Sequence, residues 1–202
     1  MKLYYSPGSC SVAAHIVLQE SGLPFQVARV DLKSKLTADG TDYNTINPKG
    51  YVPAVQLDDG QLICENTALL PFLGEQNPKS GLLPAAGTMD NYRVREWTGY
   101  ISVELHKNLS PLFRPNTPEA VVQAQHQLLK RRFGYVNEKM GKGPYLTGNT
   151  FTVADAYLFV VLSWFPKLNL DRNEYPNLQA FYERVRARPA VQNVAKEQGI
   201  TF

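Results

Sequence analysis

The sequence predicts a chain of two parts, an α/β part in its first eighty residues and an all-helical part after it. Three observations support this division. Strand and helix patterns alternate over residues 1–80, a stretch rich in proline and glycine follows, and beyond it apolar residues recur only at three- and four-residue steps. We therefore expect one domain over residues 1–80 and a second over residues 88–202, since 202 residues suffice for two small domains.

The first part reads as β-α-β, a loop, and β-β-α. A β-rich run opens the chain, a helix begins at Ser11 and is stopped by Gly22 and Pro24, and an alternating strand follows. A polar, lysine-rich loop separates these elements from two strands joined by a hairpin turn at Asp58-Asp59-Gly60, and a helix then begins near Asn66. The expected strands are residues 2–5, 25–30, 53–57 and 62–64.

The second part contains helices only. Apolar residues with helical spacing cover residues 94–109 and 121–140, and residues 153–165 are apolar nearly all round, which is typical of a helix buried on every side. Two shorter helices follow, separated by Arg188-Pro189. Thr152 and Asp155 have the spacing of a capping box at the start of the buried helix, so we interpret Asp155 as a capping residue rather than a catalytic carboxylate.

Composition and charge exclude several classes of protein. The chain is 44% hydrophobic with a net charge of +3, which excludes a disordered chain, and no basic run is dense enough to predict a nucleic-acid partner. The longest apolar stretch, residues 156–165, is too short to span a membrane, and the chain turns polar and Pro/Gly-rich after residue 5, so we expect no signal peptide. Two cysteines are too few for a secreted disulfide framework. We expect a cytoplasmic protein with free thiols and no membrane partner.

Cys10 is the first candidate for chemistry. It follows a strand and a glycine turn at the mouth of a helix, where unpaired amides and the helix dipole favour a thiolate. Residue 13 is Ala, so the Cys-x-x-Cys pair of a dithiol oxidoreductase is missing. Cys64 lies in an apolar strand and is most simply a small buried hydrophobic residue.

Two further segments favour a peptide-like ligand. Pro53 leads into a strand and cannot donate to its ladder, which indicates an edge or a cis bond, and a cis bond would leave the Val52 backbone free to pair with an extended ligand. Glu65-Asn66 opens a helix, whose exposed amides would bind a carboxylate while Glu65 takes an ammonium group. A plain helix cap explains Glu65-Asn66 equally well. Together with Cys10, the segments suit glutathione, an extended tripeptide with a central thiol.

The chain resembles a cytosolic glutathione S-transferase over its whole length, and its match to the bacterial beta class is close. The resemblance rests on four motifs in order, namely Tyr5-Ser6-Pro7-Gly8-Ser9-Cys10-Ser11, Asn47-Pro48-Lys49-Gly50 ahead of Val52-Pro53, Glu104-Leu105-His106-Lys107, and Phe151-Thr152-Val153-Ala154-Asp155-Ala156-Tyr157. It implies a thioredoxin-like first domain, a helical-bundle second domain, a homodimer, and detoxification by joining glutathione to hydrophobic electrophiles. Glutathione would be a co-substrate, with no cofactor or metal.

The resemblance also implies roles for single residues. Cys10 would contact the glutathione sulfur and form a mixed disulfide with it, while Lys35 would bind the glycine end and Val52 would supply backbone pairing. Glu65 and Asn66 would hold the γ-glutamyl end. Val103 and His106 would face the sulfur, with His106 supplying a donor or a positive charge. Further candidates are Ser11, Gly99, Glu104 and Leu105.

The spacing of the residues supports the roles of Val103 and His106, whereas Gly99 lacks the side chain that its role requires. Residues 99, 103 and 106 fall at i, i+4 and i+7 of a helix, which places them on one face. Gly99 stands where the family usually carries an Asn or Asp that reaches the γ-glutamyl amine across the dimer, and glycine offers no such group.

Two alternatives to conjugation stay open on the sequence. A cysteine at a helix mouth suits a glutathione-dependent thiol transferase or peroxidase at least as well. A non-enzymatic carrier of hydrophobic ligands is the third reading, because a fold does not by itself define a function.

Overall fold

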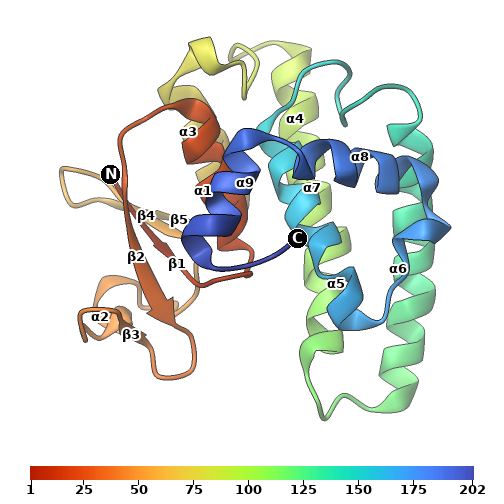
Figure 1. Cartoon of the computed structure of the whole chain (residues 1–202), viewed down its shortest axis with the longest axis horizontal. Coiled ribbons are helices and arrows are strands. Elements are labelled where there is room, and N and C mark those ends of the chain that lie inside the picture. The colour runs from red at the N-terminus through yellow and green to blue at the C-terminus, as the bar shows by residue number, and fades with distance from the viewer.

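The computed structural model describes residues 1–202 and has the two expected parts, a small mixed sheet with its helices and a bundle of helices beside it (Figure 1). The strands are β1 (Lys2–Tyr5), β2 (Gln26–Asp31), β3 (Leu36–Thr37), β4 (Ala54–Gln56) and β5 (Leu62–Cys64). The helices of the first part are α1 (Ser11–Ser21), α2 (Tyr43–Ile46) and α3 (Asn66–Gln76), followed by the short turn η1 (Pro78–Ser80).

The sheet has the order β3-β2-β1-β4-β5. Strand β1 runs parallel to β2, with Leu3 opposite Val27, and antiparallel to β4, with Leu3 opposite Val55. Strands β4 and β5 form the predicted hairpin, closed by a backbone bond from the Leu57 amide to the Gln61 carbonyl. Because β1 lies in the middle, the turn after it delivers Cys10 to the centre of one end of the sheet.

The lysine-rich loop holds more structure than its sequence predicts. It contains the two-residue strand β3 and the single-turn helix α2. The Asp42 side chain caps α2 by accepting from the Asn44 amide at 2.9 Å. Both elements are too short to give a periodic signal, so composition alone describes this segment as a loop.

The second part is a helical bundle. Its helices are α4 (Met89–Tyr100), α5 (Lys107–Leu109), α6 (Glu119–Met140), α7 (Val153–Ser163), α8 (Pro176–Arg186) and α9 (Pro189–Gln198), with the short turns η3 (Ser110–Phe113), η4 (Phe165–Leu168) and η5 (Arg172–Glu174). Between α4 and α5 lies a π-helical turn, η2 (Ile101–His106), in which the Lys107 amide donates to the Ser102 carbonyl five residues before it. The helical segment predicted over residues 94–109 is therefore continuous, and it contains one π-helical turn.

The predicted capping box is present at the start of α7. The Asp155 carboxylate accepts from the Thr152 amide at 2.8 Å and from the Thr152 hydroxyl at 2.9 Å. Its second oxygen accepts from the Leu146 amide at 2.9 Å, which ties the preceding loop to the helix. Asp155 is fully buried among these donors, so the structure uses it as a capping residue.

The two parts share one core. A single cluster of 42 buried residues runs through both, because α1 packs against α3 on one side and against α7 and α9 on the other. Polar bonds close the junction as well. The Trp164 indole donates to the Gly8 carbonyl at 2.9 Å, and Arg188 donates to both Glu20 oxygens at 2.6 and 2.9 Å. None of the helices has the length and apolar character needed to cross a bilayer.

Candidate functional site

Cys10 caps α1 at the junction of the two parts, where its side chain is half-buried. Its thiol donates to the Val52 carbonyl at 3.2 Å. The Val52-Pro53 bond is cis, as one of the two readings of the sequence predicts. The side-chain amide of Asn66, at the start of α3, donates to the Cys10 carbonyl at 3.2 Å. The structure therefore brings together Cys10, Val52 and Asn66, which lie in three separate segments of the sequence.

The expected thiolate at Cys10 is wrong for the free protein. Burial raises the pKa of the Cys10 thiol to about 12, and the Glu65 carboxylate adds to the rise. A backbone hydrogen bond at the helix mouth lowers the pKa, but by less than burial raises it. At neutral pH, Cys10 is a protonated thiol that donates to Val52.

Glu65 and Asn66 lie beside Cys10 at the start of α3. Asn66 is 6% exposed, and its Oδ1 is buried with no hydrogen-bond partner, so it presents a free acceptor. Glu65 is exposed and pairs with Lys49 at 3.0 Å. Its backbone has a φ of 65°, an unfavourable conformation for a residue with a side chain, which costs about 1–2 kcal/mol and is found most often at functional sites.

Lys35 is placed by the same loop that carries Val52. Its φ of 61° makes it one of only three residues other than glycine with a positive φ, and Glu65 is another. The Lys35 ammonium donates to the Gly50 carbonyl at 2.8 Å and lies 5.6 Å from the centre of the Tyr51 ring. Lys35 has no carboxylate partner in the protein, so its charge is available to an anion.

His106 reaches the junction from the second part and is neutral at physiological pH. Its Nδ1 lies 2.7 Å from the Tyr157 hydroxyl, and its ring centre lies 4.9 Å from that of Trp164. Burial lowers the pKa of His106 to about 4, and the charge on Lys107 lowers it further. The sequence predicts that His106 supplies either a hydrogen bond or a positive charge. Because the imidazole is neutral, the predicted positive charge is wrong.

The other candidate residues from the second part do not share one environment: one is exposed, one is buried, and one is ion-paired. The π-helical turn interrupts the i, i+4, i+7 spacing, and Val103 is 61% exposed while His106 is packed against aromatic rings. Leu105 is fully buried in the core, and Glu104 pairs with Arg132 at 2.9 Å. A side chain added at Gly99 would meet nothing within 4 Å.

Ser11 stabilises the turn that carries Cys10. Its hydroxyl accepts from the Ser6 amide at 3.1 Å and lies 2.7 Å from the Ser9 hydroxyl. These bonds account for the buried Ser11 side chain without a ligand.

Sequence reasoning missed three aromatic residues of the junction. Tyr157 bonds His106, and Trp164 lies between His106 and Phe113, whose ring centre is 5.6 Å away. Tyr157 was visible in the sequence as the only hydroxyl-bearing aromatic residue of an otherwise apolar helix, and such a group needs a partner when it is buried. Phe113 is 47% exposed, whereas Trp164 is 4% and Tyr157 1% exposed, so Phe113 is the ring of this group that is accessible from outside.

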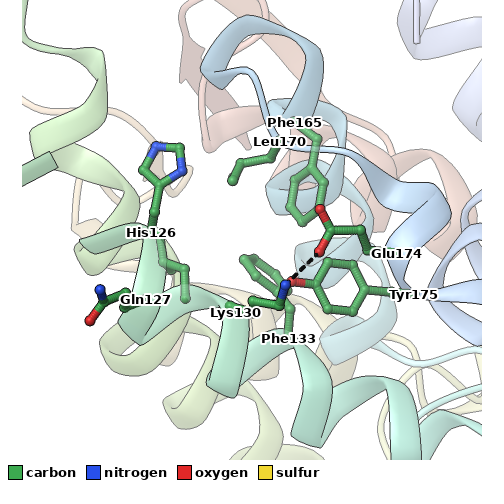
Figure 2. Close-up of a pocket in the computed structure, with 9 residues that line it drawn as sticks. His126, Gln127, Lys130, Phe133, Phe165, Leu170, Glu174 and Tyr175 are labelled. Carbon is green, nitrogen blue, oxygen red and sulfur yellow. Dashed lines mark ion pairs between the residues drawn. The ribbon is translucent and has the colours of Figure 1, made fainter. Parts of the chain in front are cut away.

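A pocket of about 250 Å³ lies elsewhere, between α6 and the turns η4 and η5 (Figure 2). Phe133, Phe165 and Tyr175 form its apolar floor, and the Lys130–Glu174 ion pair of 3.3 Å crosses one side. None of the predicted site residues lines it. No group of three or more His, Cys, Asp or Glu side chains is placed to hold a metal ion.

Comparisons with known proteins agree with the two-part structure. Residues 8–76 match the glutathione S-transferase N-terminal domain, and residues 100–189 match the C-terminal domain. The chain is 42% identical over 200 residues to glutathione S-transferase GstA of Escherichia coli O157:H7, covering 99% of this chain and all of that protein.

Solved structures extend this similarity. A ternary complex of BphK, a bacterial glutathione S-transferase, has a TM-score of 0.97 with 46% identity, and covers 99% of this chain and 100% of that one. The bacterial beta-class glutathione S-transferase of Sphingomonas chungbukensis has a TM-score of 0.95 with 37% identity, and both chains are fully covered.

A thioredoxin-like domain joined to a helical bundle is the fold of the cytosolic glutathione S-transferases. The chain belongs to the glutathione S-transferase family and, within it, to the bacterial beta class. It is a glutathione transferase.

Proposed function

We propose that this glutathione transferase joins the thiol of glutathione to hydrophobic electrophiles at the junction of its two domains, which we place at residues 1–80 and 88–202. The observation that carries this proposal is the convergence of Cys10, Val52 and Asn66 from three separate segments. His106 packs against Trp164, which bonds the Gly8 carbonyl in the turn before Cys10. In the reaction, the thiolate sulfur attacks the carbon that bears a leaving group. A carbon–sulfur bond forms, the leaving group departs with its electron pair, and the thiol proton is released to solvent.

The tripeptide has a complementary group for each of its parts. Lys35, which has no carboxylate partner, suits the glycine carboxylate. The unpartnered Oδ1 of Asn66 suits the γ-glutamyl ammonium, and Glu65 adds the negative charge. The Val52 backbone would pair with the central cysteine and so place its sulfur beside Cys10, with Val103 and His106 facing it from the second domain.

The electrophile would lie against the exposed ring of Phe113, which packs on the buried Trp164. The two rings are nearly perpendicular, with an interplanar angle of 85°, and Phe113 is 47% exposed. Planar, hydrophobic molecules fit such a surface because offset and edge-on ring contacts add to the burial of apolar area. Such contacts do not select one particular molecule, so the surface suits a range of hydrophobic electrophiles, as a detoxifying enzyme requires.

Formation of a mixed disulfide is the second candidate activity, and the position of Cys10 favours it. The Cys10 thiol, on a half-buried residue, lies beside the place proposed for the glutathione sulfur. With oxidised glutathione, the Cys10 sulfur would form a bond to one glutathione sulfur and release the other half as glutathione, with the Cys10 proton passing to the thiol that leaves.

A homodimer and a cytoplasmic location complete the proposal. Two-fold pairing is the commonest symmetry of soluble oligomers, and the exposed Tyr51 and Tyr92 offer apolar surface for it. Both cysteines are free, which suits a reducing compartment.

Paired assays of the wild type and Cys10→Ala test the two activities separately. We expect the wild type to conjugate a chlorinated dinitrobenzene to glutathione and to gain one glutathione by intact mass after treatment with oxidised glutathione. Cys10→Ala should lose the mass gain and keep part of the conjugation, because the groups that hold the tripeptide remain. A mass gain in Cys10→Ala would assign the adduct to Cys64. Binding of hydrophobic ligands without any turnover would replace both activities with a carrier function.

A further inference from the structure

Tyr157 places a polar group at the centre of an apolar helix. It lies on α7, is 1% exposed, and stands edge-on to the His106 ring at 5.8 Å. Its hydroxyl is 2.7 Å from His106 Nδ1. A buried phenol requires a partner, and this one reaches from the core of the bundle to a residue of the proposed site.

The surroundings of the Tyr157 hydroxyl determine which atom holds its proton. Burial raises the pKa of Tyr157, and the proximity of Cys10 raises it further, so the group is a neutral phenol at physiological pH. The neighbouring side chains of Ser102 and Asn66 lower the pKa by a smaller amount. A neutral phenol has a single proton to donate, and a buried one needs an acceptor within hydrogen-bonding distance.

His106 Nδ1 lies within that distance of the Tyr157 hydroxyl and is the acceptor for this proton. The imidazole is neutral, so only one of its nitrogens is protonated. If Nδ1 accepts from Tyr157, the imidazole proton must be on Nε2. Nε2 has no partner within the protein and is not a buried atom, so it is free to meet a ligand at the junction.

We propose that Tyr157 is a positioning residue that holds His106 in the tautomer with its proton on Nε2, so that Nε2–H donates to the sulfur of bound glutathione. The catalytic consequence rests on the proposed function, which places that sulfur beside His106. The opposite tautomer would present a lone pair to the thiolate and repel it. Tyr157 would thus act on the sulfur through the imidazole, without touching the substrate.

The tautomer can be observed directly by long-range proton–nitrogen correlation spectra of the protein labelled with ¹⁵N at histidine. The chain has three histidines, and His106→Ala identifies the signals of His106. We expect wild-type His106 to be protonated on Nε2 alone at pH 7.5. Tyr157→Phe keeps the ring and removes the hydroxyl, and should convert His106 into a mixture of both tautomers.

Kinetics supply a second, independent measurement. Tyr157→Phe should lower kcat for conjugation about five- to tenfold, the typical effect of one lost buried hydrogen bond, and leave KM for glutathione unchanged. In a His106→Ala background the same substitution should have no further effect on kcat, because its route to the sulfur is gone. Tyr182→Phe is the matched control, since it removes the hydroxyl of another buried tyrosine, on α8, away from the junction.

The outcomes separate this inference from the proposed function. A single, unchanged tautomer in Tyr157→Phe, or a wild-type proton on Nδ1, would overturn the inference. An equal loss of kcat from Tyr157→Phe in both backgrounds would also overturn it, because a purely structural role predicts that result. Full activity of His106→Ala, with the expected spectra, would instead remove His106 from the proposed site and leave its tautomer set by Tyr157.

Discussion

The protonation of Cys10 is a quantitative consequence of its place at the domain junction. Burial holds its pKa at about 12 against an ordinary value of 9.0, whereas a helix mouth alone would lower it. At pH 7.5 the thiolate fraction is then ~3 in 100,000, rather than ~3 in 100 for an ordinary thiol. The more basic thiolate is the better nucleophile by ~15- to 30-fold, so the net rate of attack on a small disulfide should be ~30- to 60-fold lower than for an ordinary thiol.

The assay is the release of thiopyridone from 4,4′-dithiodipyridine, measured from pH 6 to pH 10.5. A Cys64→Ala variant leaves Cys10 as the only thiol, and the same variant unfolded in denaturant supplies the ordinary thiol as an internal reference. We expect the native rate still to be rising at pH 10. Poor access alone would slow the reaction without moving its pH dependence. A native midpoint below 9 would refute the argument and restore the helix mouth as the dominant influence.

Three further predictions concern stability, titration and assembly. Thr152→Ala should lower the free energy of unfolding by about 1–2 kcal/mol and Tm by ~2–8 °C with unchanged kinetics, while the exposed Thr150→Ala should change neither. The pKa of His106 is lowered, so the unfolded chain binds the proton more readily between about pH 4 and 6.5. His106 should therefore contribute a rise of the unfolding free energy with pH across that window, opposed by the fall from Asp155, whose pKa burial raises to about 6. His106→Gln, compared with the wild type by urea titration, should make the slope against pH less positive. Sedimentation at micromolar concentration should give a dimer, and a monomer alone would contradict the proposed assembly.

Much of the fold could be predicted from the sequence because its longer elements carry strong local signals. The alternation over residues 25–30, the Asp-Asp-Gly turn and the Thr152–Asp155 spacing each determine an element within a few residues of chain. Strand β3 and helix α2 carry no such signal, since their pairing with β2 and capping by Asp42 depend on neighbours. The π-helical turn of η2 was likewise invisible, because a repeat of apolar residues tolerates one wide turn.

The candidate site divides in the same way. Three site residues could be proposed from their places in the sequence: Cys10 at a helix mouth, Val52 before a strand, and Asn66 at a helix start. The structure brings both Val52 and Asn66 into contact with Cys10. Trp164 could not be proposed, because it appears in the sequence as one more apolar residue of a buried segment, and for Tyr157 the sequence shows a hydroxyl in a buried helix but not the partner that it meets. Their roles appear only when η2 and the turn around Gly8 pack against α7 and η4. The direction of the Cys10 pKa was wrong for the same reason, since the desolvation comes from packing.

The joint between the domains should be sensitive to a single methyl group at Gly74. This glycine is buried on α3, and a Cβ there would lie 2.8 Å from Leu83 Cβ and 3.2 Å from Val153 Cγ1. Leu83 belongs to the linker and Val153 to α7, so the added atom would push the helix of the first domain away from both. Overpacking of this kind costs about 1–3 kcal/mol, whereas alanine in a helix gains about 0.5–1 kcal/mol over glycine.

Gly74→Ala should therefore lower the free energy of unfolding by about 1–2 kcal/mol in urea titrations. Gly134→Ala on α6 is the matched control, because its Cβ would meet nothing within 4 Å, and it should raise the free energy of unfolding by about 0.5–1 kcal/mol. Both substitutions remove the same freedom from the unfolded chain, so their difference isolates packing at the joint. Equal stabilisation by the two variants would mean that α3 can move away from the linker and α7 at little cost. A joint that yields so easily could not hold Cys10 and His106 at fixed places.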